Sequence, residues 1–233
     1  MELNKIWIDG IPAILWGTPS DKMILAAHGS HSSKIDDCMW ILAEKAIKRG
    51  YQVLSFDFPQ HGERVYETNF IMPNECVKEL MIMYRYAVQQ SKKISLFGCS
   101  MGAYFELLAF ADKEIDRVWF LSPVTDMERI IHNLMDYCQI SEEEFKQKIF
   151  VQNDIEPLYF PYYEYVRSHP IKKWQHRTYI LRGELDTICE AAYVEDFVKH
   201  FGCELTVQEN GEHWFHTESQ LEVFGSWLEK VWL

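Results

Sequence analysis

The sequence predicts an α/β protein in which helices cover both faces of a mainly parallel central sheet. Apolar runs of strand length alternate with amphipathic helical stretches along most of the 233 residues. Strands that are buried on both faces give near-continuous apolar runs, and such runs recur along this chain. The length and the lack of an internal repeat favour one domain, 1–233.

Each expected strand is a short apolar run that ends at a turn signal. The first two form a hairpin, because the Asp9-Gly10 pair between them favours a tight turn. The expected strands are KIWIDG (5–10), IPAILWG (11–17), KMILAAHG (22–29), QVLSFDFP (52–59), KISLFGCS (93–100), RVWFLSP (117–123), RTYILRG (177–183) and ELTVQ (204–208). The expected helices are 35–49, which ends at Gly50, then 74–90, 103–111, 191–200 and 218–232, which Thr217 caps.

The alternation of strands and helices breaks after the run RVWFLSP. Ser141 and Glu144 have the spacing of a capping box at the start of a helix. The stretch PLYFPYYEYV (157–166) is dense in aromatic residues and proline. We therefore expect a small cap insertion, about 124–175, that lies over the ends of the strands.

The motif GCSMG (98–102) places Ser100 between two glycines. A strand that turns sharply into a helix, with one side chain at the apex, needs small residues two positions before and after it. The apolar run KISLF precedes the motif and the helical stretch AYFELLAFA follows it, so this context is present. Ser100 is therefore a candidate nucleophile, with an ordinary turn serine as the alternative. The neighbouring Cys99 is expected to be a buried, inert thiol.

A serine nucleophile needs a base to take its proton and a carboxylate to hold that base in the correct tautomer. Asp186 follows the expected strand RTYILRG, and His213 follows the last expected strand, so both belong at the carboxyl edge of the sheet. Asp186 has a turn-capping role as its alternative. His216, three residues further on, competes with His213 for the role of base.

Five short motifs occur in one order along nearly the whole chain: HGS (28–30), DFPQHGE (57–63), GCSMG (98–102), GELD (183–186) and GEHWF (211–215). Together they resemble the α/β-hydrolase superfamily, and within it the small serine esterases and acylglycerol lipases. The resemblance implies the α/β-hydrolase fold. It also implies Ser100 as nucleophile, Asp186 as acid and His213 as base.

An oxyanion needs two donors aimed at the place where its charge develops. The turn at Ser100 puts the backbone N–H of Met101 at the start of a helix, where the helix dipole favours negative charge. The resemblance implies the backbone N–H of Ser30 as the second donor. Asp57, His61 and Gly62 are expected to shape a loop near the site.

Two histidine pairs have His-x-x-His spacing: His28 with His31, and His213 with His216. Neither pair lies on an expected helix with a third ligand, so we expect no metal. His28 is expected to brace the oxyanion loop. The sequence has no Gly-x-Gly-x-x-Gly motif and no phosphate loop, so we expect no cofactor and disfavour a dehydrogenase.

The aromatic residues of 157–166 have two interpretations. They line an acyl or aryl pocket, or they anchor the insertion to the sheet. The candidate substrate-binding residues are His28, Tyr159, Tyr162 and Tyr163.

Charge and composition exclude several partners. The net charge of −12 leaves no basic stripe for nucleic acid. We find no secretion signal and no apolar run long enough to span a membrane. The six cysteines form no Cys-x-x-Cys pair, which favours reduced thiols and a cytoplasmic location. The sequence makes no prediction of oligomeric state.

These observations lead to one hypothesis, a cytoplasmic serine hydrolase that cleaves a small to medium carboxylic ester through an acyl-enzyme. Acyl transfer and amide or peptide hydrolysis use the same three residues, so they stay open as alternatives. A non-catalytic ligand-binding protein on the same fold is the alternative from another class.

Overall fold

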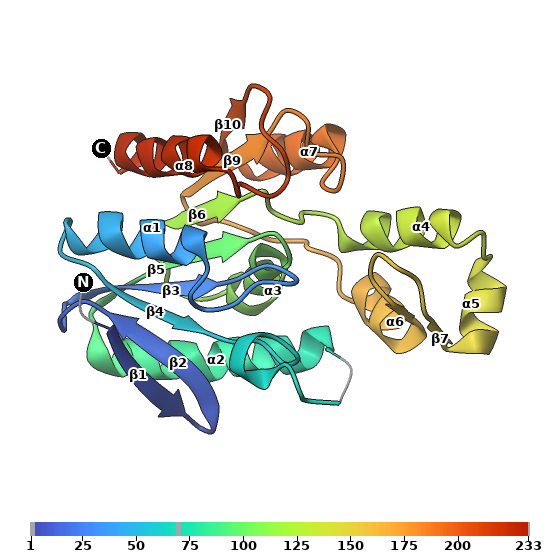
Figure 1. The fold of residues 1–233 in the computed structure, drawn as a ribbon, viewed down its shortest axis with the longest axis horizontal. Coiled ribbons are helices and arrows are strands. Elements are labelled where there is room, and N and C mark those ends of the chain that lie inside the picture. The colour runs from blue at the N-terminus through green and yellow to red at the C-terminus, as the bar shows by residue number, and fades with distance from the viewer. Residues whose placement is uncertain (1–2, 69–70, 233) are drawn as a thin grey trace.

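The computed structural model describes residues 3–68 and 71–232, and a twisted sheet forms its centre (Figure 1). The strands of this sheet are β1 (Leu3–Ile8), β2 (Ile11–Trp16), β3 (Lys22–Ala27), β4 (Gln52–Phe56), β5 (Lys93–Cys99), β6 (Val118–Leu121), β9 (Thr178–Gly183) and β10 (Glu204–Gln208). Their order across the sheet is β1-β2-β4-β3-β5-β6-β9-β10. β4, β3, β5, β6, β9 and β10 pair in parallel, which confirms the mainly parallel sheet.

The antiparallel part of the sheet lies at one edge. β1 and β2 form the expected hairpin, and β2 then pairs antiparallel with β4. The turn between β1 and β2 has φ of +48° at Asp9 and +82° at Gly10. Positive φ at both central residues gives the turn a twist that matches the flanking strands.

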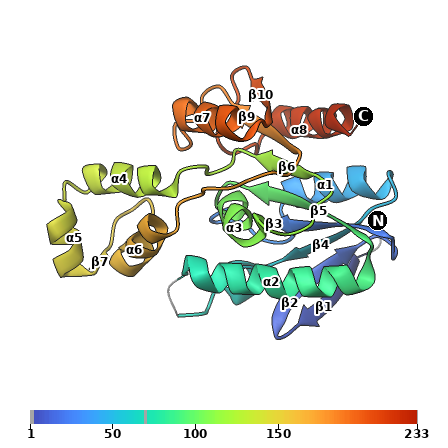
Figure 2. The same ribbon diagram turned by 180° about the vertical axis from the view of Figure 1, so that it is seen from behind.

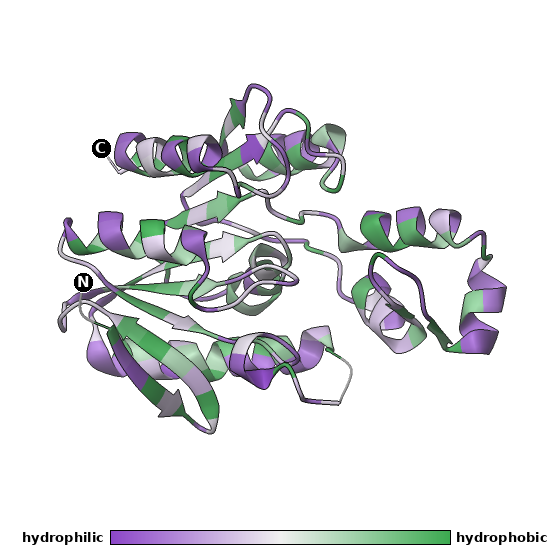
Figure 3. Ribbon diagram, viewed as in Figure 1, coloured by the Kyte–Doolittle hydropathy of each residue, from purple (hydrophilic) through white to green (hydrophobic). Residues whose placement is uncertain are grey.

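Helices cover both faces of the sheet. They are α1 (Asp37–Ile47), α2 (Pro73–Gln90), α3 (Met101–Phe110), α7 (Ala191–Phe201) and α8 (Glu218–Val231). One apolar layer packs α1 and α8 against the sheet, and the other packs α2, α3 and α7 on the opposite face, which Figure 2 shows from behind. The central strands are drawn mainly in the hydrophobic colour, whereas the helices alternate between hydrophobic and hydrophilic residues (Figure 3). This is the pattern of a sheet buried on both sides.

The first helix is shorter than its sequence predicts. α1 begins at Asp37 rather than at 35, because the Asp36 carboxylate accepts hydrogen bonds from the Ser32 and Ser33 hydroxyls and holds the preceding turn. Side chains of this kind compete with helix formation by binding locally. Thr217 caps α8 as expected, since its hydroxyl accepts from the N–H of Gln220 at 3.3 Å.

The segment between β6 and β9 lies beyond the carboxyl ends of the central strands (Figure 1). It contains α4 (Met127–Tyr137), α5 (Glu142–Lys148), β7 (Phe150–Val151), β8 (Leu158–Tyr159) and α6 (Phe160–Ser168). The capping box at Ser141 and Glu144 is present at the start of α5. We call residues 124–175 the insertion. That it acts as a cap on a single domain stays a prediction.

The cysteines form no disulfides, and the described residues contain no helix that could cross a membrane. All six cysteines have free thiols. Within the described ranges, no helix combines the length and the apolar character that a bilayer crossing requires. The cytoplasmic location stays a prediction.

Candidate active site

Ser100 stands at a strained turn between β5 and α3. Its φ is +48° and its ψ is −116°, a conformation that side-chain-bearing residues rarely adopt. Two backbone hydrogen bonds hold it there: the Ser100 N–H donates to Leu121 O at 3.0 Å, and its carbonyl accepts from Val124 N at 3.2 Å. The strain is therefore stabilised by the end of β6 and the start of the insertion.

The two glycines of the motif are required by close packing on either side of Ser100. A Cβ at Gly98 would lie 2.6 Å from Ala103 Cα, where α3 crosses the strand. A Cβ at Gly102 would lie 2.4 Å from the carbonyl oxygen of His28 at the end of β3. Both distances are shorter than any real Cβ contact, so only glycine lets strand and helix approach this closely.

Ser100, His213 and Asp186 form a continuous chain of side-chain contacts. The Ser100 Oγ lies 2.9 Å from His213 Nε2, and His213 Nδ1 lies 2.8 Å from Asp186 Oδ2. The Asp186 side chain has no exposed surface and that of His213 is 5% exposed. The structure thus brings together three residues that are 113 and 27 positions apart along the chain.

The loop after β9 binds the Asp186 carboxylate from both sides. While Oδ2 faces His213, Oδ1 accepts from the N–H groups of Ile188 at 3.0 Å and Cys189 at 2.8 Å. A buried Arg182 donates to the carbonyl of Asp186 at 3.2 Å and so fixes the same loop. The carboxylate is therefore held in one orientation and its charge is balanced by donors.

The loop that carries His213 packs directly on the loop that carries Asp186. Leu185 N donates to Gly211 O at 2.8 Å, and a Cβ at Gly183 would lie 2.3 Å from that same oxygen. His216 is on the surface, where its Nδ1 donates to Trp214 O at 2.8 Å. Of the two histidines that competed in the sequence, His213 is the one in contact with Ser100.

The loop after β3 comes up against the nucleophile turn. A Cβ at Gly29 would lie 3.2 Å from Ser100 Cβ, and Ser30 is the next residue of this loop. Met101 begins α3, and its N–H is one of the four helix donors that have no partner inside the helix. Met101 and Ser30 therefore stay the candidate donors. Their role in binding an oxyanion stays a proposal.

His28 does not face a substrate site. Its ring is fully buried, its Nε2 accepts from Phe58 N at 3.0 Å, and its Nδ1 donates to Gly29 O at 2.7 Å. Burial lowers the pKa of His28 to about 4, so the ring is neutral at pH 7. The expectation that His28 contacts substrate is not met in this arrangement, because both ring nitrogens hold the backbone instead.

A buried ion pair holds the loop after β3 in place. Lys34 Nζ contacts the Asp57 carboxylate, and Asp57 Oδ1 also accepts from Lys34 N at 2.9 Å. The second Asp57 oxygen accepts from Glu63 N at 3.0 Å. A Cβ at Gly62 would lie 2.3 Å from Asp57 Oδ1. Asp57 therefore ties the loop after β4 to the loop after β3.

The three candidate tyrosines of the insertion have different surroundings. Tyr163 is 1% exposed, packs on Phe145 and Phe160, and its hydroxyl lies 2.9 Å from His132 Nε2. These partners of Tyr163 all belong to the insertion, so the side chain holds the parts of the insertion together. Tyr159 and Tyr162 are half-buried, and they stay candidates for substrate contact.

Sequence reasoning missed two residues that connect the loops of this site to the insertion. Glu156 of the insertion reaches Ser30 and His31 on the loop after β3, with Oε2 3.1 Å from Ser30 Oγ and 3.0 Å from His31 Nε2. Glu190, at the start of α7, accepts from Arg129 at 2.9 Å and joins the Asp186 loop to α4. Neither residue belongs to a motif, so no local signal marked them.

One group of ligand-type side chains overlaps the site. The ligand atoms of Asp186, Cys189 and His213 lie within 4.8 Å of one another. Asp186 and His213 are already in contact with each other, and burial raises the pKa of the Cys189 thiol well above its ordinary value. The second Asp186 oxygen accepts from two backbone N–H groups, so the contacts of Asp186 and His213 are those of a hydrogen-bonded pair.

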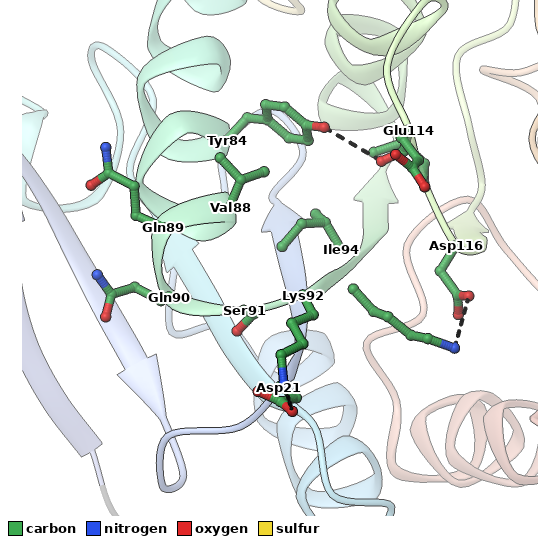
Figure 4. Close-up of a pocket in the computed structure, with 12 residues that line it drawn as sticks. Asp21, Tyr84, Val88, Gln89, Gln90, Ser91, Lys92, Ile94, Glu114 and Asp116 are labelled. Atoms are coloured by element: carbon green, nitrogen blue, oxygen red, sulfur yellow. Dashed lines mark hydrogen bonds and ion pairs between the residues drawn. The ribbon is translucent and has the colours of Figure 1, made fainter.

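A hollow of about 820 Å³ lies at the opposite edge of the sheet, at the amino ends of β3, β5 and β6 (Figure 4). Two ion pairs lie along its rim: Lys92 lies 2.8 Å from Asp21, and Lys93 lies 3.9 Å from Asp116. Reactive groups are instead concentrated at the carboxyl ends of the strands, where α/β sheets bind ligands. Volume alone therefore does not locate the site.

Three solved structures are similar to the chain over nearly its whole length. Mouse α/β-hydrolase domain-containing protein 10 has a TM-score of 0.78 at 14% identity, with 99% of this chain and 98% of that chain covered. Est1E from Butyrivibrio proteoclasticus with ferulic acid bound has a TM-score of 0.76 at 18% identity, with 97% and 98% covered. The Pyrococcus furiosus esterase Pf2001 has a TM-score of 0.69 at 22% identity, with 98% and 89% covered.

The chain therefore has the α/β-hydrolase fold, as its sequence motifs predict. Its sequence matches no protein-family model and no curated protein.

Proposed function

We propose that this protein is a serine hydrolase that cleaves a carboxylic ester of small to medium size through an acyl-enzyme on Ser100. The observation that carries the proposal is the unbroken contact chain from Ser100 Oγ to His213 at 2.9 Å and from His213 to Asp186 at 2.8 Å. The strained backbone at Ser100 supports it, because such strain is kept where it presents a reactive group.

In the acylation step, Ser100 Oγ attacks the ester carbonyl carbon while His213 Nε2 takes the Oγ proton. The carbonyl oxygen becomes an oxyanion, for which the N–H groups of Met101 and Ser30 are the proposed donors. The intermediate collapses as His213 gives its proton to the departing alkoxide. The products of this step are an alcohol and an acyl group bonded to Ser100.

In the deacylation step, water attacks the acyl carbon and gives a proton to His213, which returns it to Ser100 Oγ as the carboxylic acid leaves. Asp186 stabilises the imidazolium in both steps. Because Oδ2 accepts from Nδ1, the Nε2 lone pair points toward Ser100, which is the tautomer that a general base requires.

In this proposal, side chains of the insertion contact the acyl group of the substrate. Tyr159 and Tyr162 offer aromatic surface there, and esters of aromatic acids are among the first substrates to test. Est1E, which shares the fold, has been solved with ferulic acid, an aromatic carboxylic acid. Acyl transfer to another acceptor uses the same acyl-enzyme, and product analysis in the presence of an added alcohol separates it from hydrolysis.

The test is covalent labelling with a fluorophosphonate, which reacts with activated serine nucleophiles. We expect the wild-type protein to gain the mass of one adduct that maps to Ser100, and the Ser100→Ala variant to gain none. Ser219→Ala, which removes an exposed serine from the start of α8, is the matched control and keeps the adduct.

Two outcomes would contradict the proposal. Folded wild-type protein without an adduct would mean that Ser100 is not activated, and the ligand-binding alternative would take its place. An adduct on Cys99 in place of Ser100 would assign the reactivity to the thiol next to the turn.

A further inference from the structure

The insertion contacts the loop after β3 through one carboxylate. Glu156 Oε2 accepts from the Ser30 hydroxyl at 3.1 Å and lies 3.0 Å from His31 Nε2. Ser30 and Glu156 are 126 positions apart in the chain. The two side chains of the ion pair are open to solvent, with 72% of His31 and 42% of Glu156 exposed. A molecule that enters from solvent can therefore reach this carboxylate.

The turn that carries Glu156 is fixed by Asn153. The Asn153 side-chain oxygen accepts from the N–H groups of Ile155 at 2.8 Å and Glu156 at 2.9 Å, and its amide donates to Glu156 O at 2.7 Å. A side chain that binds the backbone at three points holds the turn in one conformation. The backbone from which the Glu156 side chain extends is therefore held in place before any substrate arrives.

The Glu156 carboxylate contacts Ser30, and Ser30 is next in sequence to a residue that packs on the nucleophile turn. Gly29 packs against Ser100, with its would-be Cβ 3.2 Å from Ser100 Cβ, and Ser30 is the next residue of that loop. A substrate whose carbonyl lies between Ser100 and the Ser30 N–H therefore has the Glu156 charge close by. No substrate bound in this way avoids that charge, since the contact is to Ser30 itself.

Among the described residues, Glu156 has no ion pair with a lysine or an arginine. Lys34, further along the same loop, lies 2.6 Å from Glu63 and also contacts Asp57, so its charge is already balanced. Asp36, at the end of the loop, adds another carboxylate. His31 balances Glu156 only when its ring is protonated. When the His31 ring is neutral, the Glu156 and Asp36 carboxylates make the electrostatic field at this side of the nucleophile negative.

We propose that Glu156 determines the substrate class of the site by charge, so that esters carrying a negative charge are rejected and neutral or cationic esters are accepted. This inference rests on the proposed function, because it assigns a specificity to the same nucleophile. Like charges at this range repel, and a charge that is partly exposed to solvent is screened only in part. We expect discrimination on the order of tenfold from this one carboxylate.

The experiment compares two substrates of equal chain length, mono-p-nitrophenyl adipate and p-nitrophenyl methyl adipate, which differ in one negative charge. Release of p-nitrophenol gives kcat/KM for the wild-type protein and for Glu156→Gln, at pH 7.5 and low salt. Glutamine keeps the size of the side chain and an acceptor oxygen for Ser30. We expect the variant to raise kcat/KM for the anionic ester by roughly tenfold and to leave the neutral ester within about twofold.

Asp154→Asn is the matched control. Asp154 lies two residues before Glu156 on the same turn, but its carboxylate accepts from the Tyr137 hydroxyl at 2.9 Å, away from the loop after β3. It removes the same charge from the insertion, so it measures the long-range effect of net charge alone. We expect it to change the preference between the two esters by less than about twofold.

Fluorophosphonate labelling of the same preparations separates the two proposals. Labelling of Ser100 together with an unchanged ester preference in Glu156→Gln would overturn the role of Glu156 and leave the proposed function standing. An equal gain in Asp154→Asn would also overturn it, because net charge would then explain the preference. Absence of labelling in the folded wild-type protein would overturn the proposed function, and the role of Glu156 with it.

Discussion

Asp186 and Glu106 are both buried carboxyl groups near Ser100, and their surroundings are opposite. Asp186 accepts two backbone N–H groups and faces His213, so each of its oxygens has a partner. Glu106 lies in α3 with no exposed surface, and within the described residues neither of its oxygens has a hydrogen-bond partner. Burial without a partner raises the pKa of Glu106 well above its ordinary value.

The difference follows from the backbone on which each residue sits. Asp186 is in a loop after a strand, where backbone N–H groups are free to turn toward a side chain. Glu106 is in the middle of a helix, where the N–H groups are used by the helix itself. Glu106 Oε2 also packs against Gly98, which has no side chain that could donate a hydrogen bond. Burial therefore disfavours the charged form of Glu106, which has no donor within reach, whereas the donors around Asp186 satisfy both of its oxygens.

The largest expected effect comes from neutralising the carboxyl that has partners. Asp186→Asn keeps the size of the side chain but removes the charge that stabilises protonated His213 and selects its tautomer. We expect kcat for ester hydrolysis to fall by roughly a thousandfold to ten-thousandfold, with a smaller change in KM. Steady-state kinetics and the rate of fluorophosphonate labelling measure the loss.

Thermal unfolding of Asp186→Asn separates a catalytic loss from a folding loss. If the variant unfolds at nearly the wild-type temperature yet keeps more than about a tenth of the activity, Asp186 has no catalytic role in this protein.

An intermediate effect, on stability rather than activity, comes from replacing Glu106, the carboxyl that has no partner. The pKa of Glu106 is higher in the folded chain than in the unfolded chain. The folded state therefore binds more protons between these two pKa values, and its stability falls as pH rises through that range, by about 1.4 kcal/mol per pH unit. Glu106→Gln removes this dependence.

We expect Glu106→Gln to match the wild type near pH 4 and to be the more stable of the two at pH 7, as measured by urea unfolding. Glu195→Gln, on the exposed side of α7, is the control and should follow the wild type at every pH. A wild-type advantage that grows with pH would show that the Glu106 carboxylate is charged and has a partner in the folded protein.

The smallest expected effect concerns Glu190, whose carboxyl is neither fully buried nor alone. It accepts from Asn133 at 2.7 Å and Arg129 at 2.9 Å, and these donors lower its pKa. Because it joins α4 to the loop of Asp186, we expect Glu190→Gln to reduce kcat by about twofold to fivefold with little change in KM. Kinetics on one neutral ester measure this loss of kcat. A loss as large as that of Asp186→Asn would contradict the expectation that Glu190 matters less than Asp186.

Most of the fold could be predicted from the sequence because its strands and helices are coded locally. The runs KISLFGCS and RTYILRG are rich in apolar residues, and they form β5, near the centre of the sheet, and β9, next to the edge strand β10. Boundaries were harder, as the start of α1 shows, because the Asp36 side chain competes with helix formation through partners that lie outside the helix.

The candidate site also has a part that the sequence predicts and a part that it does not. Ser100, Asp186 and His213 each follow a predicted strand, so a parallel sheet places all three at one edge, and the contacts among them agree with that expectation. Tyr163 and His28 look alike to the sequence as candidates for substrate contact, yet both are buried. Their burial depends on packing against distant residues, which composition and spacing do not encode.

By itself, the sequence determined the strand, turn and helix around Ser100, because the two glycines and the apolar flanks act on neighbours only a few residues away. It also determined the order in which the three site residues occur. Only the tertiary structure decided that Glu156 meets Ser30 and that Glu106 has no donor. The first depends on how the insertion folds back onto the loop after β3, and the second depends on how α3 packs on the sheet. Both involve residues far apart in the chain, which local sequence patterns do not encode.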